Sequence, residues 1–420
     1  MIETRFKQTE VGLIPVEWDI KQLSTLFRFI SNNTISRENL VNQGEIMNVH
    51  YGDILIKYGS ILDIERNEVP FIDNKVLRKC RINEFAKDGD VFIADTAEDD
   101  LVCKATELYN IKRKKLVSGL HTIWLRPNTF FQPKYLGYFF NSAFYHNQIL
   151  PLIQGTKVSS VSKRAIKDTW ISIPRIEEQQ KIASALTSID NLLLSLDKLI
   201  EKKKLIKQGA LQELVTGKKR LSGFKGEWKS ANLGELCIIK DGTHQTPNYV
   251  ENGIPFYSVE NVTNNNFKSV KNITVKDHQL LTKNYQIEKG DVLMTRIGSI
   301  GVCKYIDWDV KASFYVSLAL LKFKEKSLAK FFVFYSQTED FIKDIESKSL
   351  QYATPKKINL GNISLVKIKI PFSTDEQKAI ASVLTSMEKE IESLEAKKDK
   401  YISIKKGMMQ QLLTGKVRLI

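Results

Sequence analysis

The sequence lacks a hydrophobic run long enough to cross a membrane. A spanning helix needs about 18 or more consecutive apolar residues, and the best candidate, Phe314–Phe323, is far shorter. The amino-terminal stretch MIETRFKQTE is polar and charged, which does not fit a secretory signal. These features predict a cytoplasmic protein that does not engage a membrane.

Cysteine is scarce as well. The four cysteines, Cys80, Cys103, Cys237 and Cys303, form no CxxC pair and have no histidine at a metal-binding spacing. This distribution argues against a structural zinc site and against a disulfide framework. We therefore expect a reduced protein that binds no metal.

Catalytic motifs are also missing. The triplets Thr216-Gly217-Lys218 and Thr414-Gly415-Lys416 resemble part of a phosphate-binding loop, but they lack the preceding glycine and the Ser or Thr after the lysine. Gly298-Ser299-Ile300-Gly301 lacks the pattern of a serine nucleophile. No asparagine–proline–proline–aromatic run is present, so no pocket for a flipped adenine is predicted. The sequence thus predicts a non-catalytic protein with no cofactor of its own.

What the chain does contain is an internal repeat. Residues 177–221 and 375–419 align without a gap at a constant offset of 198, and 21 of 45 positions are identical. This period is too long for a solenoid. It indicates two copies of one module, each ending in a long helix.

The repeated segments have the spacing of a coiled coil. Apolar residues recur at steps of three and four in both copies. They are Ile182, Leu186, Ile189, Leu193, Leu196, Ile200, Ile206, Ala210 and Leu214, and then Ile380, Leu384, Met387, Ile391, Leu394, Tyr401, Ile404, Met408 and Leu412. Where the first copy has Ile200 the second has Lys398, and where the second has Tyr401 the first has Lys203. Such a mismatch favours pairing between two unlike helices.

A helix of about 38 residues spans about 57 Å, and a small domain cannot bury so long a ridge. We therefore predict that the two helices pair antiparallel, with separate core helices in a larger bundle as the alternative. Thr374 and Gln377 predict a capping box at the start of the second helix. Gly217 and Gly415 predict the two carboxyl-terminal caps.

The globular parts repeat more weakly. Gly89-Asp90-Val91 recurs as Gly290-Asp291-Val292, and Val102-Cys103-Lys104 recurs as Val302-Cys303-Lys304. Short β-branched runs predict strands at 91–94, 122–125, 171–173, 292–294, 317–323 and 365–370, with helices around 134–152 and 328–347.

The expected fold class is α+β, with a pseudo-two-fold internal repeat. Two globular domains, each a short-stranded mixed sheet with helices, are joined by two long helices that form an antiparallel coiled coil. We place the domains at residues 1–172 and 222–370, and the helices at residues 173–221 and 371–420.

The charge balance favours a nucleic-acid partner. Lys and Arg number 63 against 48 Asp and Glu, which gives a formal net charge of +15 and a pI near 9.3. Basic side chains release counterions from phosphates, so a basic cytosolic protein is often a nucleic-acid binder. Charge alone supports this only modestly, because lysine-rich surfaces also maintain solubility.

Three polar and basic loops are the candidate DNA contacts. Hydroxyl and cationic side chains suit phosphates, and Gln and Asn suit adenine edges. The candidates are Thr156, Lys157, Ser159, Ser160, Lys163 and Arg164 in the first loop, Thr243, His244, Gln245, Thr246 and Asn248 in the second, and Tyr352, Lys356 and Lys357 in the third. The third loop is the positional counterpart of the first, although it lacks the glycine.

Several motifs resemble the specificity subunit of type I restriction-modification systems, over essentially the whole chain. They are Gly12-x-Ile14-Pro15-x-Glu17-Trp18; Ile173-Pro174 with Glu178-Gln179 and Ile182-Ala183; Ile370-Pro371 with Glu376-Gln377 and Ile380-Ala381; Leu214–Lys218; and Leu412–Lys416. The resemblance implies two target-recognition domains that each read half of a bipartite double-stranded DNA site. It also implies spacer helices that dock two methylation subunits, with motor-nuclease restriction subunits joining that core. S-adenosylmethionine and ATP would then belong to the partners, and helix length would set the gap between half-sites.

Two other functions remain open from the residues. The chain could be the specificity chain of a combined cleavage-and-methylation enzyme without a separate motor, or a coiled-coil scaffold that binds no DNA. Neither the recognised bases, nor the gap length, nor the methylated adenines, nor the number of restriction subunits follows from the sequence. Which loop residues contact bases and which contact phosphates is equally undetermined.

Overall fold

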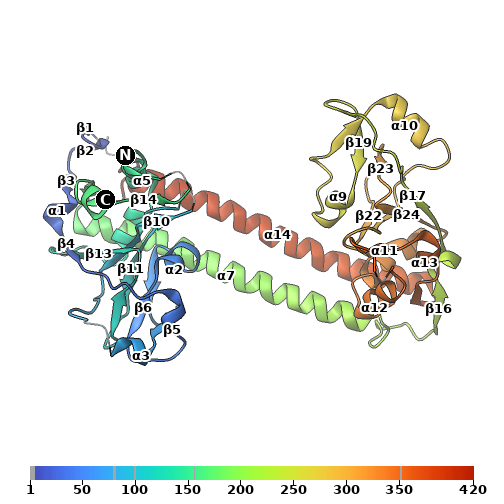
Figure 1. Ribbon diagram of the computed structural model, residues 1–420, viewed down its shortest axis with the longest axis horizontal. Coiled ribbons are helices and arrows are strands. Elements are labelled where there is room, and N and C mark those ends of the chain that lie inside the picture. Colours follow the sequence, from blue (N-terminus) through green and yellow to red (C-terminus); the bar gives the residue numbers. More distant parts are fainter. Residues whose placement is uncertain (1–4, 79–81, 99–100, 156, 351) are drawn as a thin grey trace. The chain divides into compact units, whose positions relative to one another are not determined.

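The computed structural model describes residues 5–78, 82–98, 101–155, 157–350 and 352–420 (Figure 1). The chain divides into two compact units. Unit 1 comprises Met1–Asp197 and Ala396–Ile420, and unit 2 comprises Lys198–Glu395. Each unit therefore holds one globular part together with a stretch of each long helix. Within the described ranges, no helix is both long and apolar enough to span a bilayer.

The long helices α7 (Ile176–Leu214) and α14 (Thr374–Leu412) cover the repeated segments, and each has 39 residues. Both end as predicted, a few residues before a glycine. Gly217 and Gly415 have φ angles of 72° and 68°. This left-handed conformation favours glycine because it has no Cβ, and it ends the helix by turning the chain away.

The start of α14 differs from the prediction. Thr374 is the first helical residue and not the cap. The hydroxyl of Ser373 accepts a hydrogen bond from the N–H of Glu376 at 3.4 Å, and Gln377 Nε2 donates to the carbonyl oxygen of Pro371 at 2.9 Å. The capping box was wrong because two neighbouring hydroxyl residues can each serve as a cap, and only the path of the preceding chain selects one.

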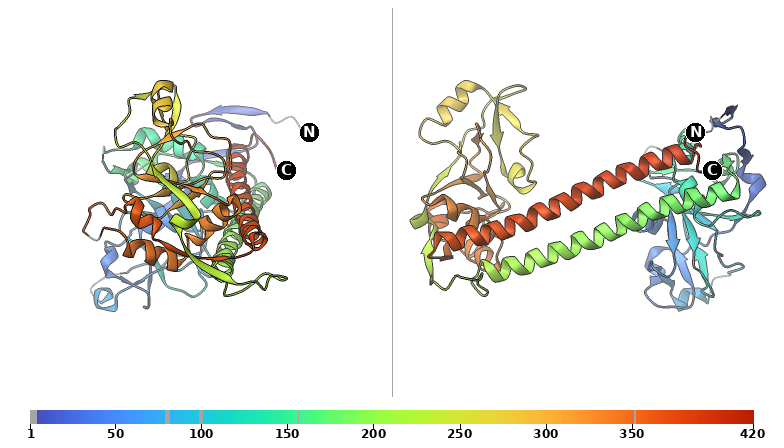
Figure 2. Two further views of the ribbon diagram at one scale, coloured as in Figure 1. Left: turned by 90° about the vertical axis from the view of Figure 1, so that its right-hand side faces the viewer. Right: turned by 180° about the vertical axis from the view of Figure 1, so that it is seen from behind.

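Within each unit, α7 and α14 run antiparallel (Figure 2). Ion pairs at 2.5 to 2.6 Å join a later residue of one helix to an earlier residue of the other. The pairs are Asp190 with Lys405 and Asp197 with Lys398 in unit 1, and Lys203 with Glu390 and Lys207 with Glu388 in unit 2. The predicted antiparallel pairing is therefore confirmed, and the alternative of separate core helices is wrong.

The internal repeat extends to the ion pairs. Shifting Asp190 by the offset of 198 gives Glu388, and the same shift takes Lys207 to Lys405. The Asp190–Lys405 pair of unit 1 thus has its counterpart in the Lys207–Glu388 pair of unit 2. Lys398 has no charged counterpart in α7, because the equivalent residue is the buried Ile200.

Part of the predicted seam is exposed. Leu186 and Leu384 are fully buried, but Ile206 and Ile404 are 47% and 39% exposed. Continuing the alternating steps of four and three residues gives Lys207 and Lys405 at these turns, and both are only 22% exposed. The seam prediction was wrong at Ile206 and Ile404 because each lies one residue before the position that faces the partner helix.

Unit 1 is built around a sheet with strand order β4-β13-β9-β11-β7, beside a second sheet with order β12-β6-β8-β5. Its strands are β1 (Phe6–Thr9), β2 (Gly12–Pro15), β3 (Asp19–Gln22), β4 (Phe27–Ile30), β5 (Leu40–Val41), β6 (Met47–Val49), β7 (Ile61–Asp63), β8 (Phe71–Ile72), β9 (Val91–Ala94), β10 (Thr96–Ala97), β11 (Ala105–Tyr109), β12 (Leu116–Ser118), β13 (Thr122–Pro127), β14 (Ser159–Ser160) and β15 (Trp170–Ile173). Its short helices are α1 (Leu23–Leu26), α2 (Tyr51–Ile56), α3 (Asn74–Leu77), α4 (Tyr135–Phe140), α5 (Ala143–Ile149) and α6 (Lys163–Lys167), with 3-10 turns at Arg37–Asn39 and Leu150–Leu152.

Unit 2 repeats this plan with sheets ordered β17-β24-β21-β22 and β18-β20-β19-β23. Its strands are β16 (Trp228–Asn232), β17 (Cys237–Asp241), β18 (Tyr249–Val250), β19 (Ile254–Tyr257), β20 (Lys271–Ile273), β21 (Val292–Thr295), β22 (Cys303–Tyr305), β23 (Ser313–Phe314), β24 (Leu318–Phe323) and β25 (Lys367–Pro371). Its helices are α8 (Leu233–Leu236), α9 (Val259–Thr263), α10 (Val275–Leu281), α11 (Lys326–Tyr335), α12 (Glu339–Ser347) and α13 (Leu360–Ser364).

The aromatic helices anchor the long helices to each core. In unit 1, α4 is buried along its whole length, and the hydroxyl of its Tyr138 donates to Asp190 of α7 at 2.8 Å. In unit 2, the α11 residues Phe331 and Phe332 are fully buried beside Leu384 of α14. The hydrophobic core of each unit therefore continues into the helix pair.

Each predicted helix at 134–152 and 328–347 is split in two. A hydroxyl breaks both, because a side chain that caps a new helix competes with continuation of the old one. Ser142 accepts from the N–H of Tyr145 at 3.2 Å before α5, and Thr338 accepts from the N–H of Phe341 at 3.3 Å before α12. The α+β class and the mixed sheets are otherwise as predicted.

Candidate nucleic-acid interface

Several segments of unit 1 emerge together at one end of its central sheet. Strand β13 is antiparallel to both neighbours, so Thr122 at its start pairs with Ala94 at the end of β9, and Trp124 pairs with Ile30 at the end of β4. Because antiparallel neighbours alternate their ends, the residues after β4, after β9 and before β13 must lie side by side. We call residues 31–33, 95–97, 119–121 and 157–163 the loop edge of unit 1.

Backbone hydrogen bonds hold these segments in a frame. The N–H of Asn33 donates to the carbonyl of Ser118 at 2.9 Å, and the N–H of Asp95 donates to the carbonyl of His121 at 3.1 Å. The N–H of Val161 in turn donates to the carbonyl of Asp95 at 2.9 Å. Four segments distant in sequence are therefore fixed by main-chain atoms, whatever their side chains.

Unit 2 has the same frame. The N–H of Thr243 donates to the carbonyl of Phe314 at 3.1 Å, and the N–H of Arg296 donates to the carbonyl of Ser317 at 2.9 Å. The N–H of Ile358 donates to the carbonyl of Arg296 at 3.0 Å. We call residues 241–248, 296–298, 315–317 and 352–358 the loop edge of unit 2.

The equivalent positions of the two frames carry different side chains. Matching the hydrogen bonds pairs Asn33 with Thr243, Asp95 with Arg296, and His121 with Ser317, and matching the strand pairings Thr96–Ser160 and Ile297–Lys357 pairs Ser160 with Lys357. One position thus changes from an acid to a base, and another from a hydroxyl to an amine. The two loop edges share their backbone and differ in their chemistry.

The loop edge of unit 1 is a polar network. His121 Nδ1 lies 3.4 Å from Asp95 Oδ1, and the hydroxyl of Thr96 donates to that carboxylate at 2.8 Å. Lys163 Nζ donates to Asn32 Oδ1 at 3.1 Å. Burial lowers the pKa of Lys163 from its ordinary value. Donors and acceptors are thus both presented here, as contact with base edges requires.

The structure brings the first candidate loop onto this network. Ser159 and Ser160 form β14, which pairs with β10 directly after Asp95. Lys163 begins α6, while Lys157 and Arg164 have exposed side chains. The candidate Thr156 lies outside the described residues.

In unit 2, Asp241 is the centre of the loop edge. Its Oδ2 lies 2.9 Å from His244 Nε2 and 3.2 Å from a terminal nitrogen of Arg296. The Arg296 side chain is only 5% exposed, and its Nε donates to the carbonyl of Ile358 at 3.2 Å. A buried guanidinium therefore fixes the carboxylate, and the carboxylate holds the exposed imidazole.

The other second-loop candidates surround this group. The Thr243 hydroxyl donates to the carbonyl of Gln245 at 3.1 Å. The side chains of Gln245, Thr246 and Asn248 are exposed beside it. This part of the chain offers hydroxyl, amide and imidazole groups in one short turn.

The third candidate loop packs on the frame at the position predicted for it. Lys357 pairs with Ile297 in an isolated bridge, and the N–H of Gly298 donates to the carbonyl of Lys356 at 2.8 Å. Tyr352 is fully exposed. Lys356 is held by an ion pair with Glu346 at 2.9 Å.

Among the frame residues that sequence reasoning missed are Asn33, Asp95, His121, Arg296 and Ser317. A signal for two of them was present. Asp95 and Arg296 each follow the four-residue strand after the repeated Gly-Asp, at 91–94 and 292–295. Among the described residues, no group of three or more His, Cys, Asp or Glu side chains is arranged to hold a metal ion.

We expect Gly242→Ala to distort the loop edge of unit 2. A Cβ built at Gly242 would lie 2.1 Å from the carbonyl oxygen of Phe314, which accepts from the N–H of Thr243 in the frame. Relieving this clash should destabilise unit 2 by about 1–2 kcal/mol, measured by denaturant unfolding. Gly361→Ala is the control, because a Cβ there meets nothing within 4 Å. Equal stability of the two variants would contradict a close approach of Gly242 to Phe314 in the frame.

Comparison with known proteins places the chain in a family. The family model described as type I restriction modification DNA specificity domain matches residues 15–208 and 225–402. A putative type I restriction enzyme specificity subunit, MjaX, from Methanocaldococcus jannaschii is 26% identical and aligns over 99% of this chain and 97% of its own length. The MjaVIII specificity subunit of the same organism is 24% identical over the same shares.

Two solved structures share the fold. The S subunit of a type I restriction-modification system from M. genitalium gives a TM-score of 0.55 at 14% identity, over 94% of this chain and 96% of its own. A chain from a structure on assembly and conformational transition of the type I system gives 0.58 at 16% identity, over 96% and 99%. With both repeats matched by the family model, the chain belongs to the type I restriction-modification specificity subunits and carries two DNA specificity domains.

Proposed function

We propose that each unit reads one half of a bipartite double-stranded DNA site through its loop edge, within a type I restriction-modification complex. The observation that carries the proposal is the frame shared by the two units, with different side chains at equivalent positions. Sequence is read by side chains that contact base edges, whereas backbone geometry sets their position. A common frame with changed side chains is what two readers of different half-sequences need.

We further propose residues 1–172 and 222–370 as the recognition domains, and residues 173–221 and 371–420 as spacer helices. Two methylation subunits would dock on the helices, and restriction subunits would join them. Exposed leucines support docking, since Leu194 is 46% and Leu205 63% exposed and large apolar side chains on a surface favour a protein partner. Catalysis, S-adenosylmethionine and ATP would belong to these partners, in the cytoplasm.

The candidate residues divide by chemistry into two classes. The exposed Lys157 and Arg164 suit phosphates, because a cation there gains counterion release without reading sequence. His244, Gln245 and Asn248 suit base edges, because they carry both donors and acceptors.

The experiment is to assemble the chain with the methylation subunit and map methylated positions in a host genome. We expect one motif made of two defined blocks separated by unspecified bases. A single contiguous block would contradict the reading by two units. Binding to the mapped site should also weaken steeply with salt, whereas a slope near zero would favour a scaffold that binds no DNA.

We expect Arg164→Gln to weaken DNA binding similarly for all sequences. Loss of one phosphate contact should reduce the slope of log affinity against log salt by about 1. The control is Lys87→Gln. Lys87 is exposed and precedes β9, whereas the loop edge follows the other end of β9. A change of sequence preference in Arg164→Gln, or an equal slope change in Lys87→Gln, would contradict the phosphate role.

A further inference from the structure

Unit 2 has a basic groove between α11, the end of β22 and the first half of α14. Its volume is about 540 Å³. Among the described residues that line it are four lysines and four hydroxyl residues, namely Lys326, Lys330, Lys378, Lys389, Ser327, Ser382, Thr385 and Ser386, with Tyr305 at one side. The α14 residues recur at steps of three and four, so they form one face of that helix.

The lysines of this groove are weakly neutralised. Within the part of the chain that the structure describes, their nearest carboxylate is Asp375, 3.8 Å from Lys378 in an exposed pair. Lys326 attracts the Glu288 carboxylate electrostatically. That carboxylate is already paired with Lys322 at 3.0 Å, so it does little to neutralise Lys326. Exposed pairs of this kind contribute little, so the four lysines leave the groove with an excess of positive charge.

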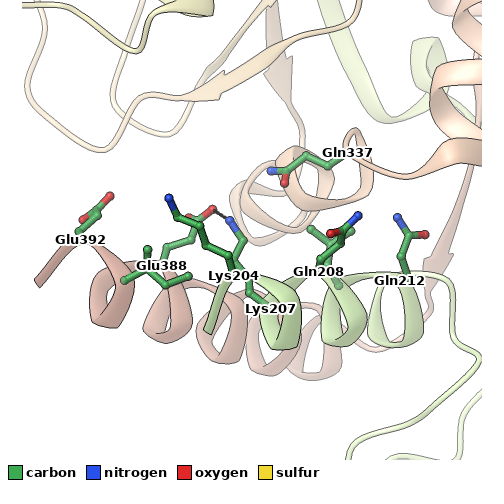
Figure 3. Close-up of a pocket in the computed structure, with 9 residues that line it drawn as sticks. Lys204, Lys207, Gln208, Gln212, Gln337, Glu388 and Glu392 are labelled. Atoms are coloured by element: carbon green, nitrogen blue, oxygen red, sulfur yellow. Dashed lines mark hydrogen bonds and ion pairs between the residues drawn. The ribbon is translucent and has the colours of Figure 1, made fainter. Parts of the chain in front are cut away.

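Unit 2 provides a contrast in a second groove of about 450 Å³ on another face of the helix pair (Figure 3). There, Lys204 and Lys207 are matched by Glu388 and Glu392, and Lys207 pairs with Glu388 at 2.6 Å. Positive charge is therefore a property of the basic groove and not of every groove in this unit.

Unit 1 contains the equivalent groove with fewer lysines. The repeat offset relates Ser184 to Ser382 and Ser188 to Ser386, and both unit 1 serines line a groove of about 420 Å³ beside α4. Among its described lining residues there is one lysine, Lys134, where the basic groove has four. The amine of Lys134 lies 4.3 Å from the ring centre of Tyr109. The position of Lys378 is occupied by Gln180.

The basic groove lies away from the proposed DNA-contacting end. Tyr305 ends β22 and pairs with Val292, the first residue of β21, whereas the loop edge follows Thr295, the last residue of that strand. DNA held at the loop edge therefore contacts the other end of the sheet. The groove instead uses a face of α14, the helix we assign to protein docking.

We propose that the basic groove of unit 2 binds an acidic segment of a partner subunit, and that the groove of unit 1 does not. The inference rests on the proposed function, because it requires a complex with other subunits. Carboxylates of such a segment would pair with the lysines, and the serine and threonine hydroxyls would donate to the remaining carboxylate or carbonyl oxygens. Two equivalent grooves with unequal charge would make the two halves of the complex chemically distinct.

The test is photo-crosslinking in the complex reconstituted from this chain, the methylation subunits and the restriction subunits. p-Benzoylphenylalanine replaces Ser386 in one preparation and Ser188 in another, since both side chains are exposed. We expect Ser386→p-benzoylphenylalanine to crosslink to an Asp- and Glu-rich segment of a partner, and the Ser188 preparation to give no such product. A crosslink to DNA, to a segment without acids, or equally from both positions would overturn the proposal.

Charge reversal gives a second, independent readout. K378E/K389E should weaken binding of the partner that crosslinks by about tenfold or more, since like charges replace complementary ones. K276E/K283E is the matched control, with two exposed lysines of unit 2 outside the groove. Unchanged partner binding in K378E/K389E, or an equal loss in the control, would overturn the proposal. Methylation of a bipartite site by the wild-type complex is measured alongside. Loss of that methylation would count against the proposed function, whereas the crosslinks and the charge reversal test the basic groove.

Discussion

Replacing His244 with alanine will weaken discrimination in one half of the DNA target and leave the other half unchanged. The His244 side chain is 72% exposed, and Asp241 holds its Nε2 at 2.9 Å. A ring that is already oriented contacts a base without further loss of conformational freedom. Loss of one such contact costs about 1–3 kcal/mol, so discrimination at the affected base pair should fall roughly tenfold to hundredfold. Competition binding of the assembled methyltransferase, with one half-site altered at a time, measures this.

The reciprocal variant is the control for this result. His121→Ala removes the exposed imidazole of unit 1, which lies 3.4 Å from Asp95. We expect it to affect the half-site that His244→Ala leaves intact. If both variants weakened the same half-site, or if each weakened both, the assignment of one half-site to each unit would be wrong.

Glu178→Ala will destabilise unit 1 by about 3 kcal/mol, the cost of leaving a buried charge without its partner. Glu178 and Arg418 are only 3% and 7% exposed. The carboxylate accepts from Arg418 Nε at 2.6 Å and from Trp18 Nε1 at 3.0 Å. The hydrogen bond from Arg418 to this carboxylate raises the pKa of Arg418. Without it, the indole N–H of Trp18 loses its acceptor, and the Arg418 guanidinium keeps only the exposed Glu17 carboxylate at 3.2 Å. Denaturant unfolding followed by Trp fluorescence, with amide exchange of β2 and β3 as a local measure, tests the loss.

Glu376→Ala in unit 2 is the matched variant and should cost clearly less. Glu376 pairs with Arg220, which is 27% exposed and can recover water as a partner. Among the described residues, Trp228 Nε1 has no hydrogen-bond partner to lose. Equal losses in the two variants, or local exchange changes confined to the wrong unit, would contradict this account.

The candidate site was only partly predictable from sequence. Loops rich in lysine and hydroxyl groups pointed to Ser159, Lys163 and His244, because their composition is local. The grouping of Asp241 with Arg296 was not predictable, since 55 positions separate them in sequence and Arg296 looks like any residue after a strand. The frame depends on hydrogen bonds between such distant segments, and no local pattern encodes their meeting.

The sequence by itself determined the duplication, the two long helices, their glycine caps and their antiparallel pairing. These properties follow from periodicity and from one repeat offset, which are readable along the chain. The tertiary structure alone decided that Ser373 and not Thr374 caps α14, that Ile206 leaves the seam, and which side chains share each loop edge. The physical reason is that antiparallel strand pairing brings together the ends of segments that are far apart in sequence, so the chemistry of the edge exists only once the sheet has formed.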